Sequence, residues 1–130
     1  MFKRIMFATV FVTDQDKALA FYTQLGFVKR ADNVWAEGRF LVIGIEGDDL
    51  NVVLWPGSQA EGRPFAGAEP ISVPGVLFIE SDDLRKDFAE LKARGIPLEE
   101  DEPQAYAYGL RATALDPDGN RVSLRQPPRS

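Results

Sequence analysis

Residues 5–26 read IMFATVFVTDQDKALAFYTQLG, and this stretch decides the fold. Its first eight residues are an apolar, partly alternating run typical of a strand, and Asp14 follows as a residue suited to cap a helix. Apolar side chains then recur at helical spacing on one face, at Ala18, Phe21, Tyr22 and Leu25. Gly26 supplies the left-handed residue that ends a helix. The stretch predicts a strand, a capped helix and a stop.

The same pattern returns later in the chain. Residues 76–95 read VLFIESDDLRKDFAELKARG. Asp83 corresponds to Asp14, and Gly95 corresponds to Gly26, at one constant offset of 69 residues. A repeated order of strand, cap, helix and stop indicates an internal duplication.

Further strands, rather than another helix, are expected after each helix. The expected strands are Val34–Ala36, Phe40–Ile45 and Asn51–Trp55 in the first half, and Leu98–Glu102, Leu110–Leu115 and Arg121–Arg125 in the second. Each half then reads β-α-β-β-β, which predicts an α+β fold of two paired modules, about 1–56 and 75–130. A connector rich in Pro and Gly, 57–74, joins them. Because modules of about fifty residues are marginal alone, we expect a single domain, 1–130, with a shared core.

The composition excludes several classes of function. The chain has neither Cys nor His, and its net charge is −5. The absence of Cys excludes disulfides and thiolate sites, and the absence of His removes the usual metal ligand and general base. Negative charge opposes binding to nucleic acid or to anionic lipid, and no apolar run is long enough to span a bilayer. We expect a cytoplasmic protein whose partner is a small molecule.

The chain resembles the vicinal oxygen chelate superfamily in the order and spacing of four segments, Val12-Thr13-Asp14, Lys17–Tyr22, Leu25-Gly26-Phe27 and Asp116-Pro117-Asp118-Gly119-Asn120. That superfamily contains glyoxalase I, extradiol dioxygenases, fosfomycin-resistance enzymes and bleomycin-resistance binding proteins. The resemblance covers nearly the whole chain. It implies that the strands of the two modules curl into a half-open barrel around a cleft, commonly within a homodimer.

The resemblance also implies where a metal would be held, and the residues there are unsuited to hold one. Phe7 and Val76 stand where metal-using relatives have the first ligand, a His, and its repeat partner, and Ser123 stands in place of a carboxylate. The counterpart of Ser123 in the first half is Val53, or Leu54 if the alignment takes no one-residue slip. These side chains cannot anchor a divalent cation. We therefore expect no metal and no cofactor, which disfavours metal-dependent glyoxalase I and extradiol dioxygenase activities.

Strand alternation predicts the lining of the cleft, because residues two apart share a face. The candidate ligand-binding residues on the strands are Phe7, Thr9, Phe11, Asn51, Val53, Trp55, Val76, Phe78, Arg121 and Ser123. Candidates for the rim of the cleft are Tyr106, Tyr108 and Arg111. An apolar, aromatic surface with few polar groups is typical of a small-molecule site. The same aromatic and aliphatic side chains would also serve as ordinary core.

Glu80 is the candidate catalytic residue, because it shares the face of Phe78. Partly buried beside aromatic rings, it could act as a general base, with Tyr108 or an Arg as electrophilic helper. The structural alternative is an ion pair with Arg121 or Arg125. The leading hypothesis is a metal-independent protein that binds a small, partly aromatic or amphipathic molecule, for sequestration or resistance. The alternatives are a metal-free isomerase or lyase that uses Glu80, and a non-catalytic module with a collapsed cleft.

Overall fold

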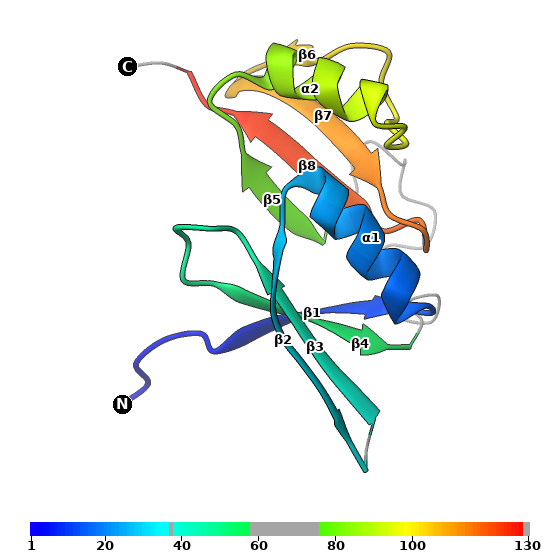
Figure 1. Cartoon of the computed structure of the whole chain (residues 1–130). Helices are drawn as coiled ribbons and strands as arrows, with labels where there is room; N and C mark the ends of the chain where they lie inside the picture. Colours follow the sequence, from blue (N-terminus) through cyan, green and yellow to red (C-terminus); the bar gives the residue numbers. More distant parts are fainter. Residues whose placement is uncertain (37, 58–75, 129–130) are drawn as a thin grey trace, which may run out of the picture. The chain divides into compact units, whose positions relative to one another are not determined.

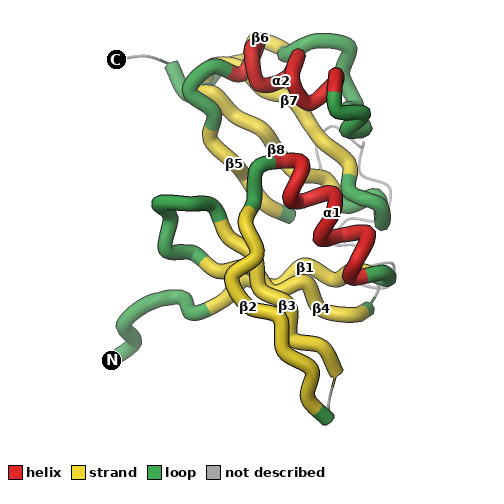
Figure 2. Tube along the Cα trace, viewed as in Figure 1, coloured by secondary structure: helices red, strands yellow, loops and turns green. Residues whose placement is uncertain are grey.

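The computed structural model describes residues 1–36, 38–57 and 76–128, and the chain divides into two compact units, Met1–Pro64 and Phe65–Ser130 (Figure 1). In the described residues, each unit consists of one helix and a four-stranded mixed sheet. The order of helices and strands along the chain is the same in both units (Figure 2). This repetition confirms the predicted α+β fold of paired βαβββ modules. The predicted connector, 57–74, lies outside the described residues except for Gly57.

The first unit places the strand that precedes its helix at one edge of the sheet. Its elements are β1 (Phe7–Val12), α1 (Gln15–Leu25), β2 (Val28–Trp35), β3 (Gly38–Gly44) and β4 (Asn51–Pro56). The strand order is β1-β4-β3-β2, in which β1 runs parallel to β4 and the other neighbours are antiparallel. A parallel pair needs a long crossover connection, and here α1 and the β2–β3 hairpin are part of it.

The second unit repeats this topology. Its elements are β5 (Leu77–Glu80), α2 (Leu84–Ala93), β6 (Gln104–Tyr106), β7 (Gly109–Leu115) and β8 (Arg121–Gln126). The strand order is β5-β8-β7-β6, with β5 parallel to β8. Neither helix described here is long and apolar enough to cross a membrane.

The predicted helix boundaries are confirmed by the capping hydrogen bonds. The carboxylate of Asp14 accepts from the backbone N–H of Lys17 at 3.0 Å, and that of Asp83 accepts from Lys86 at 3.2 Å. Each cap satisfies a backbone donor that the first turn of a helix leaves unpaired. Gly26, with φ +121°, ends α1 in a conformation that residues with a Cβ rarely adopt. The two matching caps fix the residue at which each helix begins.

Each helix packs against one face of its own sheet. In the first unit, α1 presents Ala18, Phe21 and Tyr22 to a buried layer that includes Val10, Val12, Leu41, Ile43 and Leu54. In the second unit, the helix side chains are Leu84, Phe88 and Leu91, and the buried sheet residues are Ala112, Ala114, Val122 and Leu124. We call the opposite face of each sheet its helix-free face. Strand alternation sends a second set of side chains to that face.

Two strand predictions need correction. Strand β2 is longer than the expected Val34–Ala36, because it starts at Val28 and pairs along β3. The expected strand Leu98–Glu102 is wrong: Leu98 forms only an isolated bridge with Ala114, and β6 lies further along the chain. The physical reason is that the Glu100 side chain takes the place of a strand partner. It accepts from the backbone N–H of Thr113 at 2.7 Å, which interrupts the backbone ladder.

Candidate functional site

The helix-free face of the first unit carries the residues that alternation predicts for it. Phe7, Thr9 and Phe11 on β1 are in register with Asn51, Val53 and Trp55 on β4. Val10 and Val12, between them on β1, are 1% and 0% exposed under the helix, whereas Phe7 and Phe11 are each 39% exposed. The structure therefore places these six candidate residues together on one face, with two phenylalanine rings partly open to solvent.

Four aromatic rings gather on this face around Phe40 of β3. Its ring centroid lies 5.3 Å from that of Trp35 in a stacked arrangement, 5.5 Å from Phe7 edge-on and 6.5 Å from Trp55. We call Phe7, Trp35, Phe40 and Trp55 the aromatic wall. Trp35 remains 58% exposed, so the wall presents apolar ring surface to solvent. Offset and edge-on geometries of this kind are the favoured arrangements of aromatic pairs.

The candidate residues chosen from the sequence omit two members of the aromatic wall, Trp35 and Phe40. Alternation within β3 could have placed Phe40 on this face. Its neighbour Leu41 faces the helix and is fully buried, so Phe40 points to the opposite face. Trp35 depends on the register of β2 with β3, where it lies opposite Gly38. That register includes an irregularity between Lys29 and Ala31, which the sequence pattern does not reveal.

Asn51 has a structural partner on this face. Its side-chain oxygen accepts from Nη1 of Arg30 at 2.9 Å. The same guanidinium donates to the backbone carbonyls of Ile45, Asp48 and Leu50, so it holds the loop between β3 and β4. The Asn51 oxygen is therefore already used in positioning this loop.

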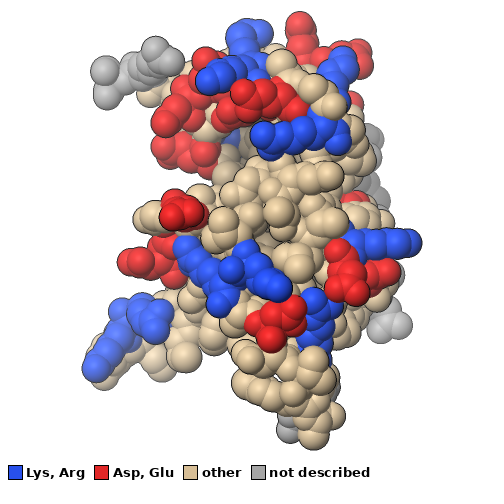
Figure 3. Space-filling view, viewed as in Figure 1, with Lys and Arg blue, Asp and Glu red and all other residues tan. Residues whose placement is uncertain are grey.

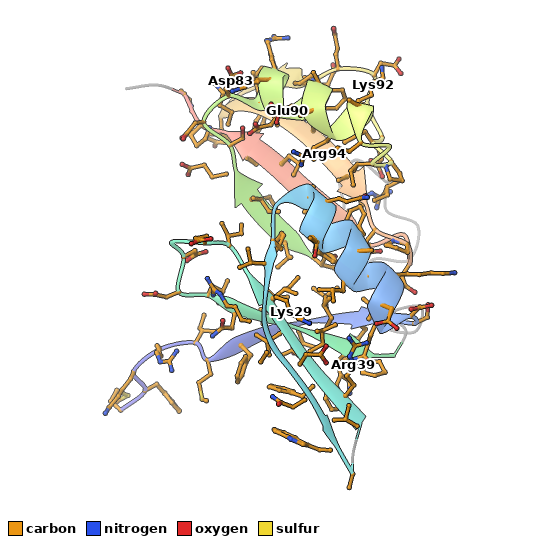
Figure 4. The ribbon with its side chains drawn as sticks, viewed as in Figure 1. Lys29, Arg39, Asp83, Glu90, Lys92 and Arg94 are labelled. Atoms are coloured by element: carbon orange, nitrogen blue, oxygen red, sulfur yellow. The ribbon has the colours of Figure 1, made fainter. Side chains whose placement is uncertain are left out.

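An ion-pair cluster fixes the hairpin that carries Trp35 and Phe40. Arg39 of β3, labelled in Figure 4, is the centre of this cluster. It donates to both carboxylate oxygens of Asp32 on β2, at 2.8 and 2.9 Å, and to Asp16 of α1 at 2.7 Å. The hydrogen bonds from Arg39 hold the pKa of Asp32 below its ordinary value, with a smaller contribution from Lys29. Hydrogen bonds to Asp32 and Asp16 raise the pKa of Arg39. The cluster ties β2, β3 and the start of α1 together.

The helix-free face of the second unit combines rings with positive charge. The guanidinium carbon of Arg125 on β8 lies 5.0 Å from the ring centroid of Phe78 and 5.5 Å from that of Tyr106. The guanidinium of Arg111 on β7 lies 5.9 Å from the Tyr106 ring. Tyr108 contacts Tyr106 edge-on at 6.0 Å and is 73% exposed. The structure thus brings Phe78 and the three rim candidates together around Arg125, which the sequence predicts only as an ion-pair partner of Glu80 or as the electrophilic helper of this residue.

Four other candidates of the second unit have different surroundings. Glu80 is exposed and in register with Arg125. Arg121, the other expected partner of Glu80, donates instead to Glu99 at 2.6 Å. Ser123 is 4% exposed and in register with Phe78, and the backbone N–H of Val76 donates to the carbonyl of Arg121 at 2.8 Å.

The positions that the resemblance assigns to metal ligands do not fit a divalent cation. The register settles the choice between Val53 and Leu54, because Val53 lies opposite Thr9 on the helix-free face and Leu54 is buried on the other face. The side chains of Phe7, Val53 and Val76 have no donor atom, and a neutral serine hydroxyl is a weak ligand alone. Within residues 1–36, 38–57 and 76–128, no group of three or more Asp, Glu, His or Cys is arranged to hold a metal ion.

The polar turn after β7 is explained by its own hydrogen bonds. The carboxylate of Asp116 is 4% exposed and accepts from the backbone N–H groups of Asp118 and Asn120, at 2.9 and 2.8 Å. It also accepts from the side-chain amide of Asn120 at 2.9 Å. This is the turn chemistry that the sequence predicts.

Charged side chains of both signs are interspersed on the face of the molecule that Figure 3 shows. Negative net charge with mixed surface charge is unlike the basic stripe of a nucleic-acid-binding protein.

The chain has the fold of paired βαβββ modules, and each of its two sheets has a helix-free face with aromatic side chains. Comparison with known proteins identifies the family. Residues 4–124 match the family described as the Glyoxalase/Bleomycin resistance protein/Dioxygenase superfamily, and the chain belongs to it. A similar solved structure is TnmS3, an antibiotic binding protein from Streptomyces sp. CB03234, with 31% identity, 98% of each chain covered and a TM-score of 0.77.

Two further relatives cover most of the chain. A glyoxalase/bleomycin resistance protein from the same Streptomyces strain is 33% identical, covers 93% of this chain and 97% of its own, and has a TM-score of 0.68. The uncharacterized protein YurT of Bacillus subtilis is 29% identical, with 95% of this chain and 98% of YurT covered.

Proposed function

We propose that this protein binds a small, partly aromatic or amphipathic molecule, with the aromatic wall as the main contact surface. The observation that carries the proposal is the position of four rings on the face that α1 leaves free. Clustered exposed rings are costly in a soluble protein unless they serve an interaction, since each buries a large apolar area when covered. A planar ligand would gain stacking and edge contacts there.

Sequestration of a toxic compound is the physiological role that fits this proposal. TnmS3, which has a similar fold and sequence, is an antibiotic binding protein. Binding of this kind needs affinity without a chemical step, and apolar ring surface supplies affinity. We therefore favour resistance or storage over turnover.

We further propose that binding needs no metal and no cofactor. The support is the chemistry of Phe7, Val53, Val76 and Ser123, three of which have no donor atom. Dialysis against a chelator should leave the affinity for a ligand unchanged within about twofold. Loss of binding on chelation, together with stoichiometric metal in the untreated protein, would contradict this part of the proposal.

Tryptophan fluorescence gives a direct test of ligand binding at the aromatic wall. Its only two tryptophans, Trp35 and Trp55, both belong to the aromatic wall. Titration with aromatic metabolites, polycyclic antibiotics and the minimal probes 2-naphthoate and 2-naphthamide should change their fluorescence, with matching heats by calorimetry. The variants Trp35→Phe and Trp55→Phe keep a ring and separate the two signals. If no compound binds to protein that circular dichroism shows to be folded, the proposal fails.

The other hypotheses stay open to separate tests. A metal-free isomerase or lyase would need Glu80 as its base, but the side chain is exposed rather than partly buried. A non-catalytic module would show no ligand for either helix-free face. A homodimer stays a prediction, which light scattering would test, and a cytoplasmic location likewise stays a prediction.

A further inference from the structure

Two arginines lie directly opposite one another on the helix-free face of the second unit. Arg111 of β7 and Arg125 of β8 are register partners in an antiparallel pair, so their side chains leave the same face. Like charges in this position repel one another. The two positive charges together favour the binding of an anion between them.

Two carboxylates of the second unit, Glu99 and Glu100, have partners other than Arg111 and Arg125. Glu99 is paired with Arg121 at 2.6 Å, and Glu100 accepts from both the backbone N–H and the hydroxyl of Thr113, at 2.7 and 3.0 Å. Among the described residues, no ion pair within 4.0 Å is recorded for Arg111 or Arg125. Glu80 is the carboxylate in register with Arg125, and it is exposed.

One donor of this pair is buried without an acceptor. Nε of Arg111 is shielded from solvent, and no hydrogen-bond partner for it is found in the described part of the chain. A buried N–H that makes no hydrogen bond is costly, and the cost is larger when the group is charged. An acceptor oxygen from a ligand would remove this cost once the Arg111 side chain turns enough to expose Nε.

The rings around the arginines indicate what else the ligand contains. Tyr106 lies against both guanidinium groups, and Phe78 lies against Arg125 and is 61% exposed. Guanidinium planes and aromatic rings hold one another in fixed orientations. A planar carboxylate attached to an aromatic ring could then accept from an arginine while its ring contacts Phe78 or Tyr106.

We propose that Arg111 and Arg125 form a binding site for the carboxylate of an aromatic ligand. The inference rests on the proposed small-molecule function and adds to it a contact surface on the second unit that is selective for aromatic carboxylates. An arginine fork matches the planar geometry of a carboxylate through two parallel hydrogen bonds, and such charge-assisted bonds are stronger than neutral ones. Affinity should therefore depend on the negative charge and on both arginines.

The first experiment compares 2-naphthoate with its neutral counterpart 2-naphthamide on the unchanged protein, by calorimetry. We expect naphthoate to bind at least about tenfold more tightly, since hydrogen bonds to charged groups contribute at this scale. In a ¹⁵N-labelled sample, the Nε–H signal of Arg111 should move with naphthoate and stay in place with naphthamide. Equal affinities together with an unmoved Arg111 signal would overturn the inference but leave the proposed function standing. Absence of binding by both probes would count against both proposals.

The second experiment uses variants. Arg111→Met and Arg125→Met should remove most of the preference for naphthoate while leaving the affinity for naphthamide within about twofold. Arg85→Met is the matched control, because Arg85 is exposed on α2 and its loss changes the net charge equally. The control should keep the full preference. If Arg85→Met reduces the preference as much as Arg111→Met does, general electrostatic attraction explains the binding and the proposed site is wrong.

Discussion

Replacing Phe40 by leucine tests the aromatic wall most specifically, because Phe40 contacts the other three rings. Leucine keeps apolar bulk and removes the ring. The variant loses three ring pairs, with centroid distances of 5.3, 5.5 and 6.5 Å. At about 0.5 kcal/mol for each partly exposed pair, the free energy of unfolding should fall by about 1.5 kcal/mol. A bound aromatic ligand should lose one ring contact of about 1 kcal/mol, which raises Kd about fivefold.

Phe21→Leu is the matched control on the other side of the same sheet. Phe21 lies on the buried face of α1 and is 6% exposed, and its ring meets that of Tyr22 at 4.9 Å. Its replacement should cost a similar amount of stability, about 1.5 kcal/mol or less. The affinity of the folded variant for 2-naphthamide should stay within about twofold, because this ring lies between α1 and the sheet, away from the helix-free face.

Stability is measured by urea unfolding followed by far-ultraviolet circular dichroism, which avoids the altered environment of the tryptophans. Affinity is measured by calorimetry in the absence of urea. The reasoning is refuted if Phe40→Leu binds 2-naphthamide as well as the unchanged protein does. It is also refuted if Phe21→Leu weakens binding as much as Phe40→Leu.

Three further changes test other parts of the account. A Cβ at Gly44 would collide with the guanidinium of Arg30, so Gly44→Ala should lower stability by about 1–3 kcal/mol. The loss of stability caused by Gly44→Ala should be clearly smaller in an Arg30→Ala background. Equal losses in the two backgrounds of this double-mutant cycle would contradict the collision with Arg30. Asp32 should stabilise the fold above its ordinary pKa of 3.8, and this contribution should be lost as the pH falls through the lowered pKa. Asp32→Asn should therefore lower the urea midpoint at pH 7 and have little effect at pH 2, whereas an unchanged midpoint at pH 7 would contradict the pairing with Arg39. If the protein has an isomerase or lyase activity that uses Glu80, Glu80→Gln should abolish turnover and preserve ligand affinity, and unchanged turnover would remove Glu80 from the reaction.

Local patterns were sufficient to predict the duplicated fold. The caps at Asp14 and Asp83 and the positive-φ stops at Gly26 and Gly95 depend on the chemistry of a few adjacent residues, and the structure reproduces all four. Strand alternation also placed Phe7, Thr9 and Phe11 on a common face, because the side-chain period of a strand is fixed. These features need no knowledge of distant partners.

Features that depend on pairing between strands were missed. The stacking of Trp35 on Phe40 depends on the β2–β3 register, which contains an irregularity near Arg30. The position of β6 depends on a side-chain contact from Glu100 to Thr113 across the sheet. The buried Nε of Arg111 likewise becomes visible only when β7 is paired with β8. Such long-range contacts leave no periodic signal along the chain.

A ¹⁵N-labelled sample titrated with 2-naphthamide would test the aromatic wall most directly. The account predicts shifts in the indole N–H signals of Trp35 and Trp55 and in the amides of β1, β3 and β4, while the amides of α1 stay in place. Shifts centred on α1, with both indole signals unmoved, would show that the ligand binds to the other face of the sheet and would contradict the account.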